Sequence, residues 1–465
     1  MSKSEEEIIE ERKRKLKELL FKKNFIFLVF ALVLLILAWH IRTANVSKLR
    51  DITTGDYTLG PDLDPYLFLR YAKSIIETGK ISEIDSMRYV PLGFKTATET
   101  WFLPYLIAFF HKLLNIFNPQ VSVNYSAVIF PAFMFLLTVI AFFLLSGKVF
   151  EEHKYRWYIA FVASLFLILS PAFLPRTIAG IPEKESAGFF FMFLAFYFFL
   201  CSFKESKEKK AYIFGGLAGL STVCMGLIWG GVIYIFTVIG IFEGFMWLFN
   251  KIEKKELISY GIWLATSFTL LPLLYERFSF KGLVTSISSG TSFAVFILIF
   301  IDFILFRTKI KNYALIKKLE EKFPKKIISV TFFIIVFIIG STLIFGTKFI
   351  TNFVGDILFH LTQPYADRFS FTVAENRQPY FNEWRDEFGP IIKDIPILFS
   401  LFFFGSILLF YKTLKIRQKE KIYLTLIYSY FLFSLIFSRY SPQSIMNGTS
   451  LISKAFYFSG ICVFG

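Results

Sequence analysis

Long apolar segments recur along the whole of this 465-residue chain and restrict its fold more than any other feature. Many of them approach the roughly 20 residues that a helix needs to cross the hydrocarbon core of a bilayer. Only helices or closed barrels satisfy every backbone group in lipid, and continuous apolar runs without a two-residue alternation exclude a barrel. We therefore predict an all-α polytopic membrane protein, with spans at about 25–41, 121–146, 157–174, 187–203, 211–228, 229–249, 257–275, 291–306, 327–346, 396–411 and 422–437, and another beginning near 450.

The amino-acid composition supports the same class of protein. Hydrophobic residues make up 55% of the chain and 63 residues are Phe, which is more apolar surface than a soluble domain of this length needs. The three cysteines, Cys201, Cys224 and Cys462, are scattered through apolar segments without CxxC spacing. We therefore expect neither a disulfide framework nor a zinc site, and interpret the cysteines as packing residues.

Basic residues cluster between the apolar runs, at 11–23, 204–210, 251–256, 307–326 and 412–421. Cytoplasmic loops of membrane proteins carry such an excess of Lys and Arg. With residues 1–24 as a cytoplasmic N-terminus, every cluster falls inside, and the outside loops are 42–120, 175–186, 276–290, 347–395 and 438–449. The net charge of +16 thus indicates the topology of a multi-pass cell-membrane protein, with anionic membrane lipids rather than nucleic acid as the counter-charge.

Two segments near the N-terminus need separate interpretation. The first apolar run is a signal anchor, because "LILAWHIR" offers no small-residue cleavage site. Residues 101–117 are long enough for a span but contain Pro104, His111 and Lys112. Counting them as a span would place the later basic clusters outside, so we predict a helix that lies at the membrane interface.

Three outside loops carry acids beside Pro or Gly: "GPDLDPY" (60–66), "RTIAGIPEKESAG" (176–188) and "FTVAENRQPYFNEW" (371–384). Each has a purely structural alternative. Asp64 before Pro65 fits a helix N-cap, and the acids at 183 and 185 suit the first turn of the next span. "TVAE" fits a capping box, although Pro379 would interrupt a helix that begins there.

Carboxylates that converge at one membrane face need a cation to offset their repulsion. Oxygen ligands from separate loops suit Mg²⁺ or Mn²⁺ better than zinc, and none of the four histidines is near these acids in sequence. Such an ion would also engage a phosphate leaving group. The sequence therefore points to a divalent-metal site at the outside face.

The elements "DLDPY", "RTIAGIPEKE" and "TVAENRQP", in this order and sidedness, resemble those of the catalytic subunit of oligosaccharyltransferases, especially archaeal ones. These enzymes belong to the GT-C class of multi-spanning glycosyltransferases, and the resemblance covers essentially the whole chain. It implies a GT-C transmembrane domain over residues 25–465, with long outside loops at 42–120 and 347–395. The implied bundle has about 11–13 transmembrane helices.

The resemblance also implies roles for the acids of the first two motifs. Asp64 would bind the metal and polarise the acceptor amide as a catalytic residue, with Asp62 as a neighbouring substrate-binding residue. Glu183 and Glu185 match the second acidic motif of the family. The implied metal ligands are therefore Asp64, Glu183 and Glu185.

The third motif and a nearby arginine complete the implied site. Glu375 would be the catalytic glutamate of a T-x-x-E motif that begins at Thr372, and both residues would reach the acceptor peptide. Arg176 stands just ahead of the second acidic motif. It would support substrate binding by orienting carboxylates or by countering phosphate charge.

The implied reaction moves an oligosaccharide from a lipid phosphate or pyrophosphate carrier, such as dolichyl, to Asn in Asn-x-Ser/Thr. Resonance makes an amide nitrogen a poor nucleophile, so carboxylates that accept hydrogen bonds from its N–H groups would activate it. Mn²⁺ or Mg²⁺ would stabilise the departing phosphate, and a single displacement would invert the anomeric carbon. The implied partners are the lipid-linked donor, an acceptor polypeptide and membrane lipids.

One departure from the family concerns the C-terminal part. The family's Trp-Trp-Asp-Tyr-Gly motif, which lies in a C-terminal globular domain, does not occur here, and the chain stops within an apolar run at 451–465. We expect the membrane region of a longer enzyme, inactive without that domain. Arg439 and Lys454 are weak substitutes for a later-span Arg that contacts lipid phosphate in the family.

Two other functions stay open. A GT-C enzyme that takes one sugar from a polyprenyl phosphate, such as a protein O-mannosyltransferase, would share the fold and the first-loop acids, but it does not explain "TVAENRQP". A membrane transporter would explain the spans. Transport sites favour broken helices near the bilayer midplane, however, whereas these acids are predicted in outside loops.

Overall fold

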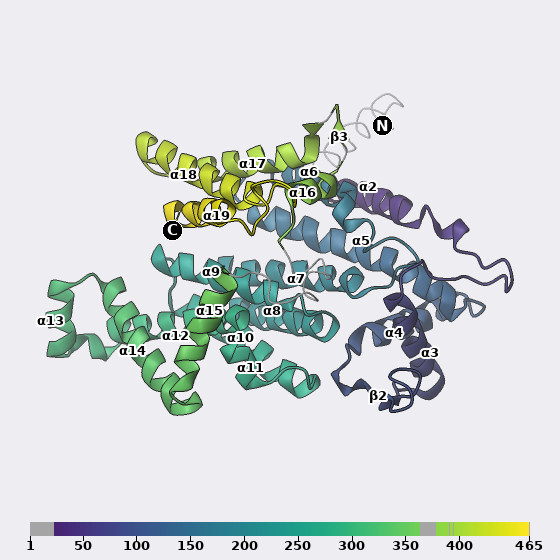
Figure 1. Ribbon diagram of the computed structural model, residues 1–465, viewed down its shortest axis with the longest axis horizontal. Coiled ribbons are helices and arrows are strands. Elements are labelled where there is room, and N and C mark those ends of the chain that lie inside the picture. Colours follow the sequence, from purple (N-terminus) through teal and green to yellow (C-terminus); the bar gives the residue numbers. More distant parts are fainter. Residues whose placement is uncertain (1–22, 363–377, 390, 394, 465) are drawn as a thin grey trace, which may run out of the picture. The chain divides into compact units, whose positions relative to one another are not determined.

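The computed structural model describes residues 23–362, 378–389, 391–393 and 395–464, and helices make up nearly all of their regular structure (Figure 1). The helices are α2 Lys23–Thr43, α3 Asp64–Thr78, α4 Phe102–Phe117, α5 Val123–Val149, α6 Arg156–Leu169, α7 Lys184–Lys204, α8 Glu208–Ile228, α9 Val232–Leu248, α10 Lys254–Leu274, α11 Phe280–Thr285, α12 Ile287–Arg307, α13 Ala314–Lys322, α14 Lys325–Phe345, α15 Lys348–Thr362, α16 Phe381–Glu387, α17 Ile397–Thr413, α18 Gln418–Phe437 and α19 Leu451–Phe464. The strands β1 Ile84–Asp85 and β2 Phe94–Lys95 form one antiparallel pair, and β3 Ile391–Ile392 and β4 Ile395–Pro396 form another.

Every apolar run predicted to span the membrane lies on a helix, so the predicted polytopic all-α fold is confirmed. Eight of the described helices are long and apolar enough to cross a membrane: α2, α5, α7, α8, α10, α12, α14 and α18. The remaining predicted spans are the shorter apolar helices α6, α9, α17 and α19. The segment 101–117, expected as a helix at the membrane interface, is the helix α4.

The chain divides into two compact units. The first contains residues 1–168 and 173–336, and the second contains residues 169–172 and 337–465. The range 347–395, expected as an outside loop, holds the helices α15 and α16 as well as the β3–β4 pair. The two acidic motifs at 60–66 and 176–188 both belong to the first unit.

Glycines on α8 let this helix pack closely against α10. A Cβ atom on Gly219 would lie 2.6 Å from the Cβ of Thr266, and one on Gly215 would lie 2.8 Å from the carbonyl oxygen of Ser259. A spacing of four residues puts both glycines on one helix face, and small residues at this spacing allow close approach of membrane helices. The pair α8–α10 therefore forms a tightly packed centre of the first unit.

The first loop is a small folded layer that covers one end of α5. Arg70 of α3 forms an ion pair with Asp85 of β1, whose carboxylate also accepts hydrogen bonds from the Tyr71 hydroxyl at 2.9 Å and the Met87 backbone N–H at 3.1 Å. The hydrogen bond from Arg70 lowers the pKa of Asp85 to about 2. Beneath this network, buried side chains of α3 and α4, including Phe68, pack against α5. The start of α3 is thereby fixed against the membrane helices.

In the second unit, the start of α16 packs on the residues that follow α18. The backbone N–H of Phe381 donates to the carbonyl oxygen of Arg439 at 2.8 Å, and the Phe381 ring stacks on Tyr440 with centroids 5.6 Å apart. Arg439 itself is buried, with its guanidinium carbon 4.4 Å from the centroid of the Tyr380 ring. Arg439 is thus held within this aromatic cluster.

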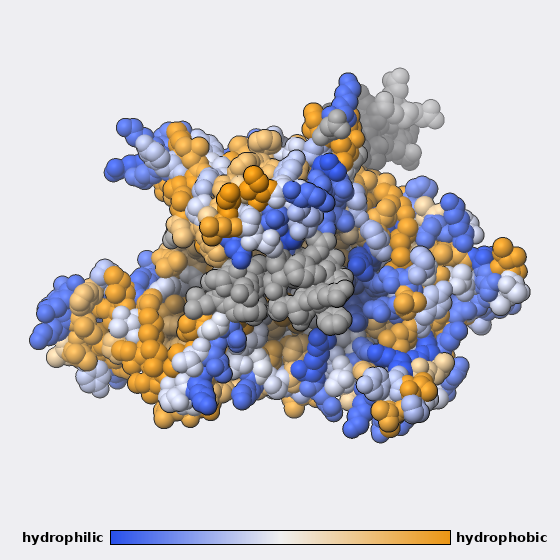
Figure 2. All heavy atoms as spheres, in the orientation of Figure 1, coloured by the Kyte–Doolittle hydropathy of each residue, from blue (hydrophilic) through white to orange (hydrophobic). Residues whose placement is uncertain are grey.

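Apolar side chains are exposed along α14, as expected for a helix in contact with lipid. Leu343 and Ile344 are 81% and 74% exposed, and Ile335 and Ile339 are about half exposed. Figure 2 shows hydrophobic surface in this region of the molecule. Extended apolar surfaces of this kind mark membrane or protein contacts rather than contact with water.

Candidate functional site

The segment between α6 and α7 is fastened to three other parts of the first unit. The backbone N–H of Ala179 donates to the carbonyl of Arg42 at the end of α2, and the N–H of Gly180 donates to the carbonyl of Val128 in α5, both at 2.8 Å. The N–H of Gly60 in turn donates to the Gly180 carbonyl at 2.8 Å. These bonds tie the first acidic motif to the second through the backbone.

Gly180 is needed at this junction. Its φ of +92° lies in the left-handed region that side chains disfavour, and a Cβ atom there would lie 2.5 Å from Cδ1 of Leu49 and 3.4 Å from the Gly60 nitrogen. Any other residue would strain the backbone and push the first loop away. The close approach of the two acidic motifs therefore depends on this glycine.

Three charged side chains from the two motifs meet at the start of α7. Glu183, the residue just before this helix, is 5% exposed. Its carboxyl group forms an ion pair with Arg176 and a hydrogen bond with the carboxyl group of Asp62. Asp62 also accepts a hydrogen bond from the Leu63 backbone N–H at 2.8 Å. Two carboxyl groups in direct contact avoid repulsion only when they share a proton or when a cation lies beside them.

The electrostatics of Glu183 reflect this contact. Burial, the hydrogen bond with Asp62 and the charge of Glu185 together raise the pKa of Glu183 to about 7, and Arg176 opposes this change. The Glu183 carboxyl group can thus keep its proton up to near-neutral pH. A titratable group with such a raised pKa, in contact with a second carboxyl group, is typical of functional sites.

The other two acids of these motifs lie beside the contact. Asp64 is the first residue of α3, is exposed, and makes no hydrogen bond or ion pair with another described residue. The N-cap position belongs to Leu63, so the alternative interpretation of Asp64 as an N-cap is wrong. Glu185 lies in the first turn of α7, where its charge acts on Glu183. The structure thus brings Asp62 and Glu183 into contact and leaves Asp64 two residues from it.

Arg42 is part of this arrangement and was missed from the sequence. It is fully buried, its Nε donates to Oγ1 of Thr177 at 2.7 Å, and its guanidinium carbon lies 4.1 Å from the centroid of the Phe135 ring. Thr177 is the neighbour of Arg176, so Arg42 anchors the segment that presents the second motif. An Arg at the end of an apolar run is usually interpreted as an interfacial residue, and no local signal in the sequence indicates that this one is buried.

Of the acids in the predicted metal site and its surroundings, the structure brings one pair of carboxyl groups together, those of Asp62 and Glu183. Within residues 23–362, 378–389, 391–393 and 395–464, no three His, Cys, Asp or Glu side chains are close enough together to form a metal-binding group. The pair Asp62 and Glu183 supplies oxygen donors from two separate loops, which is the donor chemistry that Mg²⁺ and Mn²⁺ prefer. Thr372 and Glu375 of the T-x-x-E motif lie outside the described residues.

Comparison with known families and relatives gives a consistent result. The family model described as "Oligosaccharyl transferase STT3, N-terminal" matches residues 26–369. The chain is 28% identical over 215 residues to dolichyl-phosphooligosaccharide-protein glycotransferase 1 of Pyrococcus horikoshii, a match that covers 45% of this chain and 21% of that protein. It is 22% identical over 237 residues to the dolichyl-diphosphooligosaccharide-protein glycosyltransferase subunit stt-3 of Caenorhabditis elegans, covering 50% of this chain and 30% of that one.

Solved structures of the oligosaccharyltransferase AglB of Archaeoglobus fulgidus share the fold at 18% sequence identity. The apo form matches with a TM-score of 0.65, and the complex with an inhibitory peptide and a dolichol-phosphate matches with 0.62, each over 96% of this chain and 50% of that one. A structure with zinc and sulfate matches with 0.50, over 94% and 48%. The GT-C type of helical bundle is thereby shown, and this chain spans about half the length of these structures.

Proposed function

Because this chain belongs to the oligosaccharyl transferase STT3 family, we propose that it acts in the transfer of an oligosaccharide from a lipid carrier to protein. The donor would be an oligosaccharide on a dolichyl-type phosphate or diphosphate, and the acceptor would be Asn in an Asn-x-Ser/Thr sequence. The buried contact of Glu183 with Asp62 and Arg176 carries this proposal. This contact joins the motifs at 60–66 and 176–188 at the start of α7, one of the helices long and apolar enough to cross a membrane.

A divalent metal ion fits this point. Asp62 and Glu183 already touch, and Glu185 and Asp64 are close along the chain and carry further carboxylate oxygens. The A. fulgidus protein, in one of its solved structures, carries zinc and sulfate, which supports a divalent site in proteins of this fold. We propose Mn²⁺ or Mg²⁺ here, with Glu183, Glu185 and Asp64 as its ligands and Asp62 beside them. Among the described residues no three such groups are gathered closely enough for a metal ion, so Asp64 and Glu185 would move toward Glu183 when the ion binds. When bound, the ion would stabilise negative charge on the phosphate of the leaving group.

The protein's own residues have separate tasks. Arg176 orients the Glu183 carboxyl group and keeps positive charge beside the place where phosphate charge develops. The exposed carboxylate of Asp64 is available to accept hydrogen bonds from the acceptor amide, because no described residue occupies it. Such hydrogen bonds would weaken the amide resonance and make the nitrogen a better nucleophile. Glu375 and Thr372 are proposed to contact the acceptor peptide.

The orientation of the chain follows from its charges. Basic clusters between the apolar helices, at 204–210, 251–256 and 307–326, favour the cytoplasmic side, and the acidic motifs at 60–66 and 176–188 would then face outside. A lipid-linked donor and an acceptor polypeptide would meet there.

The experiment uses the purified full-length enzyme with a lipid-linked oligosaccharide and a fluorescent peptide that contains Asn-x-Thr. Asp64→Asn keeps the shape of the side chain and removes its charge, so glycopeptide formation should fall by about 100-fold or more, the size of loss typical for an electrostatic catalytic contact. Glu185→Gln should weaken the apparent Mn²⁺ affinity roughly 10-fold, and excess metal should partly restore transfer.

The matched control is Glu77→Gln, an exposed acid near the end of α3, which should transfer at the normal rate. Near-normal transfer by Asp64→Asn in a metal-dependent assay would remove Asp64 from the site. Transfer of a single sugar to Ser or Thr of the peptide would instead identify a GT-C enzyme with a different acceptor.

A further inference from the structure

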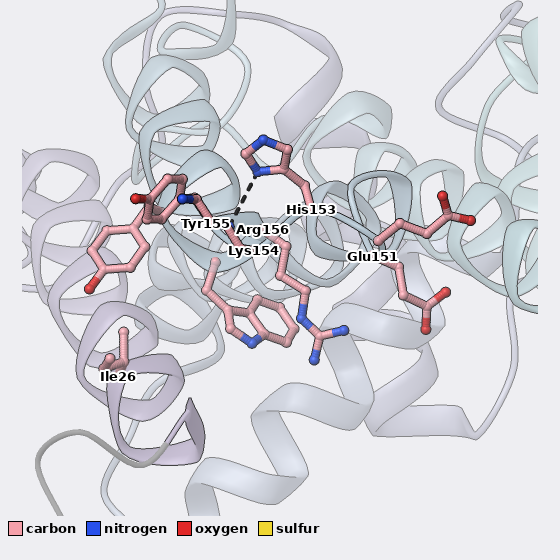
Figure 3. Close-up of a pocket in the computed structure, with 9 residues that line it drawn as sticks. Ile26, Glu151, His153, Lys154, Tyr155 and Arg156 are labelled. Carbon is pink, nitrogen blue, oxygen red and sulfur yellow. Dashed lines mark hydrogen bonds between the residues drawn. The ribbon is translucent and has the colours of Figure 1, made fainter. Parts of the chain in front are cut away.

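A second polar site lies at the opposite end of α5 from the acidic motifs. A cavity of about 400 Å³ is lined by Ile26 of α2 and by residues 151–158, which connect α5 to α6 (Figure 3). The acidic motifs meet α5 at Val128, whereas this connection begins just after Val149. At 1.5 Å per residue, the two places are about 30 Å apart along the helix, which is the thickness of a bilayer core.

The position of the cavity is therefore a membrane boundary. The apolar helices α2, α5 and α6 all begin or end beside it, and two of them are long enough to cross a membrane. Tyr155 and Tyr158, which line the cavity, are 51% and 50% exposed. Tyrosine and tryptophan at the ends of membrane helices lie at the level of the lipid headgroups.

The floor of the cavity is rigid. The Trp157 indole packs on the bare backbone of Gly147, where a Cβ atom would lie 2.3 Å from its Cζ3. The same indole makes ring contacts with Phe27 of α2 at 4.8 Å and Phe143 of α5 at 5.4 Å between centroids. Two neighbouring helices, α2 and α5, thus hold this side chain of α6 in place, so groups that rest on it are positioned before any ligand arrives.

Three side chains with hydrogen-bond donors, those of His153, Lys154 and Arg156, line the cavity next to Trp157. The guanidinium carbon of Arg156 lies 4.6 Å from the Trp157 ring centroid, and Nζ of Lys154 lies 4.6 Å from that of Tyr155. Neither cation has a carboxylate partner among the residues that the structure describes. His153 accepts the backbone N–H of Tyr155 at its Nδ1, at 3.2 Å (Figure 3), so its Nε2 carries the proton and is a further donor.

The acids of the connection do not cancel these cations. Glu151 lines the cavity but is already paired, at 2.8 Å, with Lys148, which does not line it. Glu152 is then the one acid left against Lys154 and Arg156 among the lining residues. The two acids and two bases that line the cavity balance formally, and Lys148, the partner of Glu151, adds one positive charge beside them. The N-terminus of α6 adds backbone N–H groups.

We propose that this cavity binds the phosphate of an anionic phospholipid headgroup. The flat Arg156 guanidinium on its indole support and the Lys154 ammonium hold the phosphate oxygens, and Tyr155 and Tyr158 contact the glycerol and upper acyl region. A soluble phosphate would make no contact with the exposed tyrosine rings, and its binding would not require a position at the membrane ends of three helices. Because the site is at the far end of α5 from Glu183, its ligand is separate from the donor lipid phosphate of the proposed reaction.

The test measures binding of the first lipid molecule to the purified full chain in a zwitterionic detergent by native mass spectrometry. Phosphatidylglycerol is compared with phosphatidylcholine of the same acyl chains, and inorganic phosphate is added as a competitor. Phosphatidylglycerol should bind at least fivefold more tightly than phosphatidylcholine. The variant Lys154→Gln/Arg156→Gln should lose about 30-fold, because each basic residue near an anionic headgroup contributes about fivefold.

The matched control is Lys209→Gln/Lys210→Gln, which removes the same charge from exposed positions at the start of α8 that do not line the cavity. It should change the affinity of the first phosphatidylglycerol less than threefold, and both variants should unfold at the temperature of the wild type. Equal affinity for the two lipids, or equal losses in the two double variants, would overturn the proposal. So would displacement of the lipid by inorganic phosphate at an equal concentration, which would indicate a soluble anion as the ligand.

Discussion

Replacing Glu183 with glutamine should make the metal-free chain more stable above neutral pH. The pKa of this buried carboxyl group is raised from the ordinary 4.5 to about 7. Below pH 4.5 the group is protonated in both the folded and the unfolded chain, so it contributes no pH dependence. Between pH 4.5 and 7 the unfolded chain releases its proton while the folded chain keeps it. The free energy of unfolding therefore falls as the pH rises through this window and is constant above it.

The size of the effect follows from the same values. Each unit of difference between folded and unfolded pKa corresponds to about 1.4 kcal/mol, so a rise of the Glu183 pKa from 4.5 to about 7 lowers the free energy of unfolding by about 3 kcal/mol at pH 8. The Glu183 side chain is only 7% exposed, so water screens this electrostatic difference little. Glutamine has nearly the same shape, can accept a hydrogen bond from Arg176 and can donate one to Asp62. It removes the titration without opening a cavity.

The assay is thermal unfolding of the purified chain in detergent with EDTA, followed by tryptophan fluorescence from pH 4 to pH 8. The wild type should lose stability between pH 4.5 and 7, whereas Glu183→Gln should show no such loss. The control Glu77→Gln carries the same substitution at an exposed position and should follow the wild-type profile. Parallel profiles for the wild type and Glu183→Gln would refute the buried carboxyl contact.

The same variant should have the opposite effect on metal binding. Loss of one carboxylate ligand should weaken Mn²⁺ binding roughly 10-fold or more, by comparison with losses of 10–100-fold for residues that only support a ligand. A substitution that raises stability and lowers metal affinity would indicate that Glu183 is kept for its charge and not for packing. Normal Mn²⁺ affinity of Glu183→Gln would exclude this residue as a ligand.

Two further predictions concern the first loop and the topology. Asp85→Asn should destabilise the first loop by about 2 kcal/mol, since the pKa of Asp85 is lowered from 3.8 to about 2 chiefly by Arg70, and this stabilisation is present above pH 3.8 and lost as the pH falls through 2. Faster amide hydrogen exchange in α3 and at 84–95 would show the loss, and unchanged exchange would contradict it. Single cysteines at Thr54 should react with a membrane-impermeant thiol reagent from outside, and those at Lys207 and Lys318 only from inside. Labelling of all three from one face would contradict the proposed orientation.

The helices of this fold could be predicted from the sequence because lipid imposes one simple rule. A segment in the bilayer must satisfy its backbone within itself, so length and hydrophobicity alone locate the helix. The same rule does not predict how helices pack. The close approach at Gly219 and Thr266 depends on which faces meet, and other glycines of the apolar runs, such as Gly340 and Gly405, have open space beside them. Helix α15 was expected as loop because its polar residues resemble those of a connection.

The candidate site was predicted at the level of motifs and not of atoms. The sequence places "GPDLDPY" and "RTIAGIPEKE" on one face of the membrane, and the structure brings these two motifs together. The sequence could not indicate which aspartate contacts Glu183, because Asp62 and Asp64 are two residues apart, both are exposed, and the conformation of the turn before α3 decides which one reaches Glu183. The burial of Arg42 could not be predicted for the same reason, since it depends on the loop with Thr177 that folds over this side chain.

The acidic contact is held by the backbone around it and not by the acids themselves. Two carboxyl groups repel each other when both are charged, yet Asp62 and Glu183 touch because the Gly60–Gly180 and Gly180–Val128 hydrogen bonds fix both loops on α5. In the metal-free chain, the proton that Glu183 keeps up to about pH 7 and the charge of Arg176 offset the repulsion. A divalent ion would then replace a proton at a position where two carboxyl groups already lie together, and the other carboxylates would have to move toward it. Metal affinity should therefore increase with pH up to about 7, where Glu183 loses its proton.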